Sequence, residues 1–209
     1  NPLSATSFSF TTNLPAWGNV GNAGFSAGAV NYTSLAIASD GTPYVAYQDS
    51  DNSNKATVMK FDGNNWVNVG SAGFSAGAAQ YTSLAIAPNG TPYVAYVDVG
   101  NSNQATVMEF DGFNWVYVGN AGFSAGIANY TSLAIASNGT PYVAYQDSDN
   151  SNKATVMKFD GTNWVNVGNA GFSAGVADYT SLAITSDGTP YVAYRDGGNS
   201  GEATVMSYQ

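Results

Sequence analysis

Four tryptophans recur at a fixed step of 49 residues along the chain, at Trp17, Trp66, Trp115 and Trp164. Four tyrosines keep the same step, at Tyr32, Tyr81, Tyr130 and Tyr179. The chain therefore repeats one unit four times. The consensus of this unit is close to YTSLAIA-x-x-GTPYVAY-x-D followed by ATVM-x-F-DG-x-NW-x-x-VG-x-AGFSAG. Repeats near 50 residues are typical of propellers, solenoids and arrays, because one such unit cannot bury its apolar faces alone. We expect residues 1–209 to form a single domain of four near-identical repeats.

Composition narrows the range of functions. Hydrophobic residues make up 44% of the chain, whereas only 9% of residues are charged and the net charge is −9 with five basic residues. Binding to nucleic acid or anionic lipid requires clustered basic residues, so we expect neither a nucleic-acid partner nor membrane insertion. The chain has no His and no Cys, which removes the commonest general base and thiolate metal sites. We expect no cofactor, and the surplus of Asn, Ser, Thr and Gly favours an extracellular or cell-surface protein.

Each repeat is predicted to contain four β-strands. In the first copy they cover residues 33–38 (TSLAIA), 42–47 (TPYVAY), 56–61 (ATVMKF) and 66–69 (WVNV). Asp40-Gly41 separates the first two strands, and a DG pair between apolar runs predicts a hairpin with a type I′ turn. The first two strands are apolar at nearly every position, as in strands covered on both faces, whereas the last one alternates. We name the strands a to d, with a innermost and d at the rim.

This pattern predicts an all-β propeller of four blades, each with four antiparallel strands. A β-solenoid is the alternative, although solenoid coils are shorter and do not need two tight hairpins. The last copy stops after a c strand at residues 203–208, and the chain carries an orphan d strand at residues 15–20 (PAWGNV). We expect this N-terminal outer strand to complete the last blade and close the ring, which removes open sheet edges. Residues Ala5 to Phe10 resemble a surplus c strand, for which two explanations stay open: it caps an edge at the rim, or the chain is part of a larger ring.

The c–d junction resembles that of kelch-type propeller blades. In both, strand c ends in an aromatic residue and Asp, and a Trp opens strand d. The matching residues here are Phe61, Asp62 and Trp66, then Phe110, Asp111 and Trp115, then Phe159, Asp160 and Trp164. Strand b departs from that family because it ends in Tyr-x-Asp rather than a double glycine. The whole unit is similar to repeats of secreted or cell-surface proteins of bacteria and archaea, which implies a propeller in an extracellular setting.

Strand alternation separates the connections into two faces. The a–b and c–d turns lie together on what we call the short-turn face, and the b–c and d–a loops on the long-loop face. Long loops on a rigid scaffold commonly bind ligands, so we expect glycan or protein partners on the long-loop face. The candidate ligand-binding residues are Gln48, Asp49, Val97, Asp98, Gln146, Asp147, Arg195 and Asp196, with Phe25, Phe74, Phe123 and Phe172 in the AGFSAG loops.

Metal binding and catalysis have weaker support in the sequence. Asp49, Asp51, Asp147 and Asp149 are metal candidates because DSDNSN places oxygens at alternate positions, as calcium loops do. The glycine and distal Glu of such a loop are missing, so a solvated turn explains the pattern and we expect no metal. Once-per-blade aspartates follow from the symmetry, so we expect no catalytic residues and no enzyme activity. The tryptophans are expected to pack between blades rather than stack on sugars.

Three functions remain. The first is a non-catalytic scaffold for surface or protein interactions. The second is a lectin-like, multivalent binder of glycans or small neutral ligands, in which avidity over one site per blade supplies strength. The third is that the chain is a four-blade piece of a larger ring, for example a dimeric one of eight blades.

Overall fold

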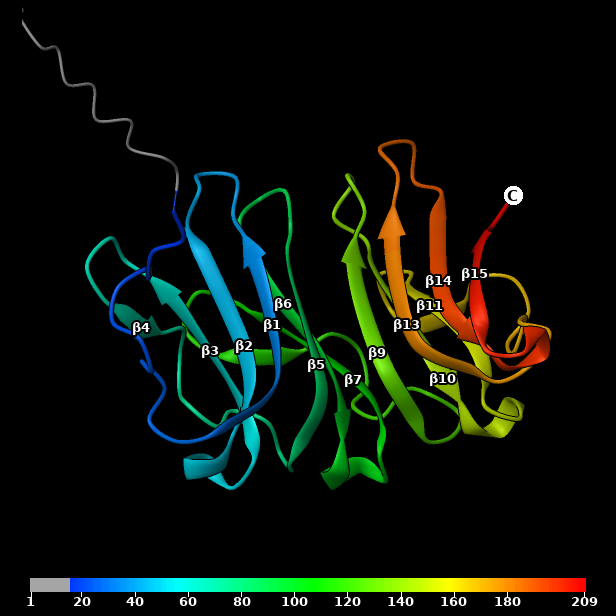
Figure 1. Ribbon diagram of the computed structural model, residues 1–209, viewed down its shortest axis with the longest axis horizontal. Coiled ribbons are helices and arrows are strands. Elements are labelled where there is room, and N and C mark those ends of the chain that lie inside the picture. Colours follow the sequence, from blue (N-terminus) through cyan, green and yellow to red (C-terminus); the bar gives the residue numbers. More distant parts are fainter. Residues whose placement is uncertain (1–15) are drawn as a thin grey trace, which may run out of the picture.

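The computed structural model describes residues 16–209 and contains only strands, turns and one-turn 3-10 helices. The surplus strand expected at residues 5–10 lies outside this range. The chain runs through four sheets in sequence order (Figure 1). No helix within the described residues is long and apolar enough to span a membrane.

Each sheet is one blade. Blade 1 contains β1 (Val30–Ile37), β2 (Pro43–Asp49), β3 (Lys55–Phe61) and β4 (Trp66–Asn68). Blade 2 contains β5 (Ala79–Ile86), β6 (Pro92–Asp98), β7 (Gln104–Phe110) and β8 (Trp115–Tyr117). Blade 3 contains β9 (Ala128–Ile135), β10 (Pro141–Asp147), β11 (Lys153–Phe159) and β12 (Trp164–Asn166). Blade 4 has three strands, β13 (Ala177–Ile184), β14 (Pro190–Asp196) and β15 (Glu202–Ser207). The one-turn helices η1 to η4 follow the b strands at Ser50–Asn52, Val99–Asn101, Ser148–Asn150 and Gly197–Asn199.

The strand order confirms the predicted propeller architecture. All neighbouring strands within a blade are antiparallel and follow the chain order a-b-c-d. The a strands pack on one another from blade to blade, β1 on β5, β5 on β9 and β9 on β13, so strand a is innermost as expected. The apolar runs of strands a and b are explained by this arrangement, because in blades 2 and 3 both faces of the inner strands meet another sheet.

The a–b hairpin differs from the predicted type I′ turn. Ala38 N–H donates to the Thr42 carbonyl and Gly41 N–H to the Ala38 carbonyl, which leaves a three-residue loop. Gly41 has a φ of +87°, whereas Asp40 is not among the residues with positive φ. The turn is therefore the type I plus left-handed glycine form. Asp40 Oδ1 instead accepts the Thr42 N–H at 2.9 Å, so the Asp fixes the turn through its side chain.

The core consists of the interfaces between adjacent blades. At the first interface, Ala46, Ala56 and Val58 of blade 1 pack against a buried set from blade 2 that consists of Leu84, Val94, Tyr96, Met108 and Trp115. Equivalent clusters join blades 2 and 3 and blades 3 and 4. Hydrogen bonds reinforce each junction, because Leu84 N–H donates to Ser34 Oγ at 3.0 Å and its equivalents repeat this bond.

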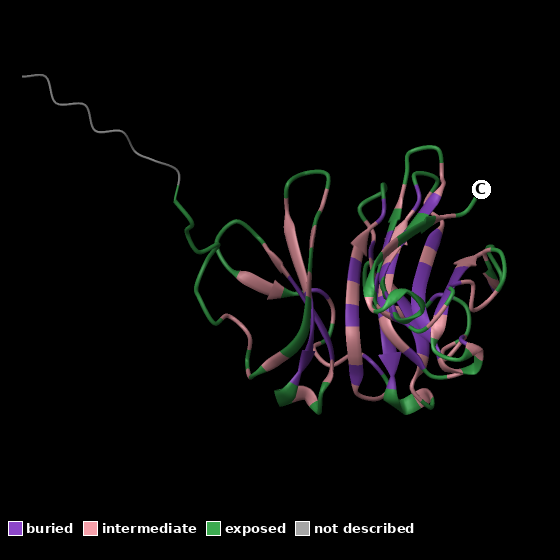
Figure 2. Cartoon of the chain, turned by 45° about the vertical axis from the view of Figure 1, so that its right-hand side comes forward, coloured by how far each residue is buried: buried purple, intermediate pink, exposed green. Residues whose placement is uncertain are grey.

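The expected closure through residues 15–20 is not formed. Pro15 lies outside the described residues, and residues 16–29 form no strand. This segment lies against blade 1, since the Trp66 indole donates to the Val20 carbonyl at 2.8 Å, and Trp17 is fully exposed. The four blades form an arc with β1 toward one end and β13 toward the other (Figure 1). Strand β1 beside the N-terminal segment is largely exposed, although β2 and β3 each keep a run of four buried residues, and at the other end of the arc β15 has no buried residue (Figure 2).

Candidate functional site

The four aspartates that end strand b have a structural role in the long loops. The Asp49 carboxylate accepts hydrogen bonds from the Asp51 N–H, from Asn52 Nδ2 and from Thr57 Oγ1, at 3.2, 2.8 and 2.9 Å. The same three kinds of partner surround Asp98, Asp147 and Asp196. All four side chains are buried and cap the one-turn helices. Both oxygens of each carboxylate are used within the loop, so we place the candidate ligand site elsewhere.

The metal candidates are engaged in the same turns. The carboxylate oxygens of Asp49 and Asp147 accept hydrogen bonds within the turn, and Asp51 and Asp149 are exposed. No group of three or more acidic, His or Cys side chains within residues 16–209 is arranged to hold a metal ion. The Asp-rich loops are thus accounted for by local hydrogen bonds to the backbone.

The positions that vary between blades are mostly buried. Gln48 and Gln146 each accept a hydrogen bond from an Asn on the neighbouring a strand, and Val97 is buried in the same place. Gln146 also donates to Asp178 at 2.7 Å, and Arg195 forms an ion pair with that same carboxylate at 2.8 Å. With 53% of its side chain exposed, Arg195 is the member of this set that reaches solvent.

The loop phenylalanines pack between blades. Phe25 stacks on Trp66, Phe74 on Trp115 and Phe123 on Trp164, with ring centroids 4.2–4.3 Å apart. Phe172 has no tryptophan partner within the described residues. The expectation that the tryptophans pack between blades is therefore confirmed for Trp115 and Trp164, whereas Trp66 packs on the N-terminal segment and Trp17 is exposed.

The long-loop face has one shallow hollow at its centre. It measures about 280 Å³ and is lined by the four repeat tyrosines and the threonines that follow them, namely Tyr32, Thr33, Tyr81, Thr82, Tyr130, Thr131, Tyr179 and Thr180. The tyrosines have φ angles of +50° to +55°, an unfavourable conformation for a bulky side chain. A bulge in each a strand produces it, and the Thr82 hydroxyl donates to the Tyr32 carbonyl across the blade boundary, with equivalents at the next two boundaries.

Larger hollows lie on the short-turn face, between adjacent blades. The cleft between blades 1 and 2 measures about 470 Å³, and the cleft between blades 2 and 3 about 550 Å³. In the first, Tyr44 and Lys60 of blade 1 face the turn at residues 89–92, Tyr93 and Glu109 of blade 2. The second repeats this arrangement with Tyr93, Glu109, Tyr142 and Lys158. We call these two hollows the inter-blade clefts.

Cross-strand pairing positions the polar groups of the clefts. Tyr44 lies opposite Lys60 on β2 and β3, and Tyr93 lies opposite Glu109 on β6 and β7. Such neighbours project from the same face of the sheet. Each cleft thereby contains one lysine and Glu109 from adjacent blades, Lys60 with Glu109 or Glu109 with Lys158, and one turn aspartate, Asp111 or Asp160. The half-buried tyrosines add an apolar surface with a hydroxyl at its tip.

The remaining carboxylates at the rim of the clefts are engaged in turns. Asp111 Oδ1 accepts the N–H groups of Asn114 and Phe113 at 2.7 and 2.8 Å, and these bonds hold the pKa of Asp111 below its usual value. Burial, followed by the adjacent Glu109 carboxylate, raises the pKa of Tyr93 far above its usual value, so this phenol stays protonated at neutral pH. Glu109 is the carboxylate that lines both clefts.

The clefts could not be predicted from the repeat pattern, because each is made by two repeats. One signal was nevertheless visible: residues 60, 109 and 158 alternate as Lys, Glu and Lys in an otherwise uniform ATVM-x-F strand. This variation lies at the short-turn end of strand c, opposite to the face on which we expected ligands.

Comparisons with known proteins support the fold. No family model and no curated protein matches the sequence. The fold is similar to a protein of unknown function from Dyadobacter fermentans, with a TM-score of 0.59 and 16% identity over 85% of this chain and 65% of that one. It is also similar to the Hadza microbial sialidase Hz136, with a TM-score of 0.60 and 16% identity over 90% and 46% of the two chains.

A third similar structure is the GH93 alpha-L-arabinofuranosidase of Fusarium graminearum, with a TM-score of 0.55 and 16% identity over 84% of this chain and 58% of that one. The chain thus spans about half to two thirds of the length of the structures it matches. At this level of identity the likeness concerns the fold, and it identifies the chain as an all-β protein of the propeller kind.

Proposed function

We propose that this chain is a non-catalytic, multivalent binder of neutral glycans, with its sites in the inter-blade clefts. The observation that carries the proposal is the repetition of one polar cleft, with a lysine, Glu109 and tyrosines, at successive blade boundaries. A volume of about 500 Å³ falls within the range of small-ligand sites, which combine aromatic surface with a few placed polar groups. A neutral, hydroxyl-rich ligand suits a cleft that offers both a donor, the lysine, and an acceptor, Glu109, beside an aromatic surface.

The chemistry of the clefts favours binding over hydrolysis. Glycoside hydrolysis usually needs two carboxyl groups placed on either side of the scissile bond. In each cleft the turn aspartate, Asp111 or Asp160, accepts two backbone N–H groups through Oδ1, whereas Glu109 takes no part in the turn. Similar folds in a sialidase and an arabinofuranosidase are compatible with glycan recognition, and an extracellular or cell-surface setting would bring the protein to such ligands.

Replacement of Glu109 tests this function, because Glu109 lines both clefts. A hydrogen bond to a charged group contributes roughly 1.5–3 kcal/mol, so Glu109→Gln should weaken binding of a neutral oligosaccharide about tenfold or more. Glu202→Gln is the matched control, since this exposed carboxylate begins β15 at the long-loop end. Calorimetric titration of both variants with hits from a glycan array provides the measurement.

Chemical-shift mapping locates the site independently. Perturbed amides should cluster at residues 89–93, 109–112 and 138–142. Shifts at Asp49, Arg195 and the tyrosines of the central hollow would instead place the site on the long-loop face, as the loop lengths first suggested. Equal weakening by Glu109→Gln and Glu202→Gln would also contradict the cleft assignment.

A further inference from the structure

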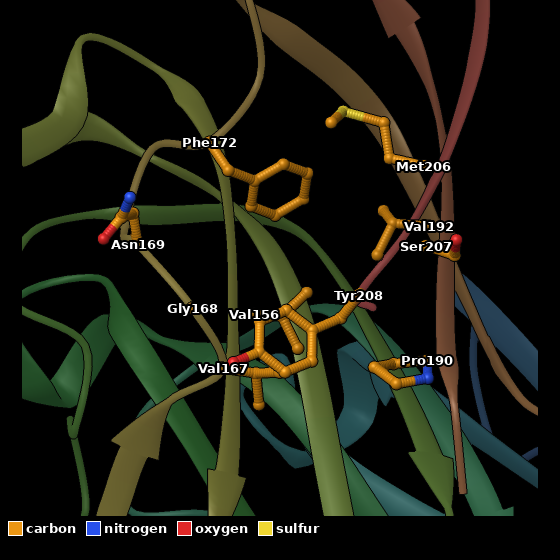
Figure 3. Close-up of a pocket in the computed structure, with 10 residues that line it drawn as sticks. All are labelled: Val156, Val167, Gly168, Asn169, Phe172, Pro190, Val192, Met206, Ser207 and Tyr208. Carbon is orange, nitrogen blue, oxygen red and sulfur yellow. The ribbon is translucent and has the colours of Figure 1, made fainter. Parts of the chain in front are cut away.

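An apolar hollow between blades 3 and 4 occupies the position that a tryptophan fills at the other two interfaces. The hollow measures about 390 Å³ and is lined chiefly by Val167, Gly168, Phe172, Met206 and Tyr208 (Figure 3). At the interface of blades 1 and 2 the corresponding space holds the Trp115 side chain, which is stacked on Phe74. Blade 4 has no d strand within the described residues, so it supplies no tryptophan here. We call this hollow the tryptophan slot.

Every feature that holds a tryptophan elsewhere is present in the slot. The indoles of Trp66, Trp115 and Trp164 donate to the carbonyls of Val20, Val69 and Val118, at 2.7–2.8 Å, and Val167 is the next residue in that series. Phe172 is the stacking partner that lacks an indole. Gly168 repeats the close approach of Gly119, because a Cβ on Gly119 would meet the rings of Phe159 and Trp164 and one on Gly168 would meet the Tyr208 ring.

The chain also carries a tryptophan without a slot. Trp17 is fully exposed, and it precedes Val20 by the three residues that separate Trp66 from Val69. Val20 already occupies its place against blade 1, through the hydrogen bond from Trp66. By the repeat geometry, Trp17 therefore belongs to the d strand of a blade that packs on the open side of blade 1.

The two ends of the arc carry the two halves of a blade interface. On blade 1, Leu35 is 66% exposed, whereas its equivalent Leu84 is 6% exposed beneath blade 1. On blade 4, Val205 is 64% exposed, whereas its equivalent Val58 is 1% exposed beneath blade 2. Leu84 and Val58 belong to one buried cluster, so Leu35 and Val205 present the same complementary surfaces. In the structure these surfaces lie at separate ends of the arc (Figure 1).

We propose that a second copy of this chain docks on blade 4 and inserts its Trp17 into the tryptophan slot. The inserted strand completes blade 4, and blade 1 of the incoming copy then covers Val205 with Leu35. The contact repeats an interface that the chain forms three times internally, so no new surface has to be created. It joins a head to a tail, and such contacts give rings when the rotation closes and filaments when it does not.

Paired variants test the proposal. The double variant Trp17→Ala with Leu35→Glu removes the docking surface of blade 1 and the N-terminal segment, which we call the head. Val205→Glu removes the docking surface of blade 4, which we call the tail. Both sets change exposed residues, so each variant should keep the circular dichroism and the thermal transition of its own blades. Wild-type chain should sediment as a complex of two or more copies, and each variant alone as a monomer. An equimolar mixture of the two variants retains one intact head and one intact tail and should form a one-to-one dimer.

Fluorine NMR with 5-fluorotryptophan reports the position of Trp17 directly. Its resonance, assigned with Trp17→Phe, should move away from the solvent-exposed value when copies associate. A monomeric chain with an exposed Trp17 would overturn the proposal. A monomeric chain with a protected Trp17 would show that the strand fills the slot of its own copy, and would overturn it as well. Association that survives Trp17→Ala with Leu35→Glu would show that another surface joins the copies.

Discussion

Replacing each tryptophan in turn by alanine should give a graded series of stability losses. Trp115 and Trp164 are buried between two complete blades, with a stacked Phe and an indole hydrogen bond. Trp66 keeps the stack and the hydrogen bond but has no blade on its outer side, and it is half-buried. Trp17 has neither partner in the isolated chain. The expected order of destabilisation is Trp115 and Trp164 above Trp66, and Trp66 above Trp17.

The magnitudes follow from the buried area. A core tryptophan buries about 150–250 Å², which corresponds to roughly 4–6 kcal/mol at about 25 cal/mol per Å². Partial collapse of the cavity brings the usual cost of Trp→Ala to about 3–5 kcal/mol, which we expect at Trp115 and Trp164. For Trp66 we expect roughly half of this, because about half of the surrounding surface is missing. An exposed side chain such as Trp17 should change the stability of the monomer by less than about 0.5 kcal/mol.

Urea unfolding at concentrations where the chain is monomeric measures the series. Repeat proteins lose cooperativity when one interface is weakened, so hydrogen exchange of peptides from each blade should accompany the unfolding curves. Trp115→Phe is the matched control, since it keeps an aromatic ring on Phe74 and loses the hydrogen bond to Val69. Equal losses for Trp17→Ala and Trp115→Ala would refute the reasoning, as would a cost below about 1 kcal/mol at Trp115.

Two further predictions concern buried polar groups. Burial, followed by the Asp49 carboxylate, raises the pKa of Tyr47 to about 12, and burial also raises that of Tyr96. Because the unfolded phenols titrate near 10, their stabilisation is complete below pH 10 and should be lost between about pH 10 and 12; tyrosinate absorbance that rises fully at pH 10 without unfolding would contradict this. Asp98→Ala should cost about 2–4 kcal/mol, since it leaves Thr106 and two other donors unpaired, and faster hydrogen exchange confined to residues 98–106 is the expected signature.

The fold could be predicted from the sequence because each rule acts within one repeat. The 49-residue step, the apolar a and b strands and the Asp-Gly and Asn-Gly turns all depend on neighbours close in the chain. The closing strand could not be predicted in this way. Whether Trp17 reaches blade 4 depends on the total rotation from blade 1 to blade 4. No residue pattern within one repeat predicts this total rotation. The N-terminal segment follows blade 1 because Trp66 and Phe25 hold it there.

The candidate site shows the same division between local and non-local information. The Asp-Ser-Asp loops are polar, long and variable, and these properties suggested a ligand site. The carboxylate that ends strand b, Asp49 in blade 1, instead accepts hydrogen bonds from Asn52 and Thr57, and its equivalents do the same. Short turns looked uninformative because they contain few residues. Their clefts arise only when the Tyr44 and Lys60 pair of one blade faces the turn of the next.

The charge alternation along the c strands links the clefts to the open ends of the arc. Lys60, Glu109 and Lys158 are followed by Ser207 in blade 4, so Glu109 lies between two lysines and each complete cleft pairs it with one of them. Blade 1 carries an incomplete cleft of about 470 Å³, lined by its own turns, Tyr44 and Lys60. A blade 4 docked on blade 1 would place Tyr191 and Ser207 at that cleft, which would then contain Lys60 and the turn aspartates Asp40 and Asp62 but no counterpart of Glu109. Assembly of copies would therefore add a cleft with different polar groups, so that the two complete clefts and the junction cleft would prefer different ligands.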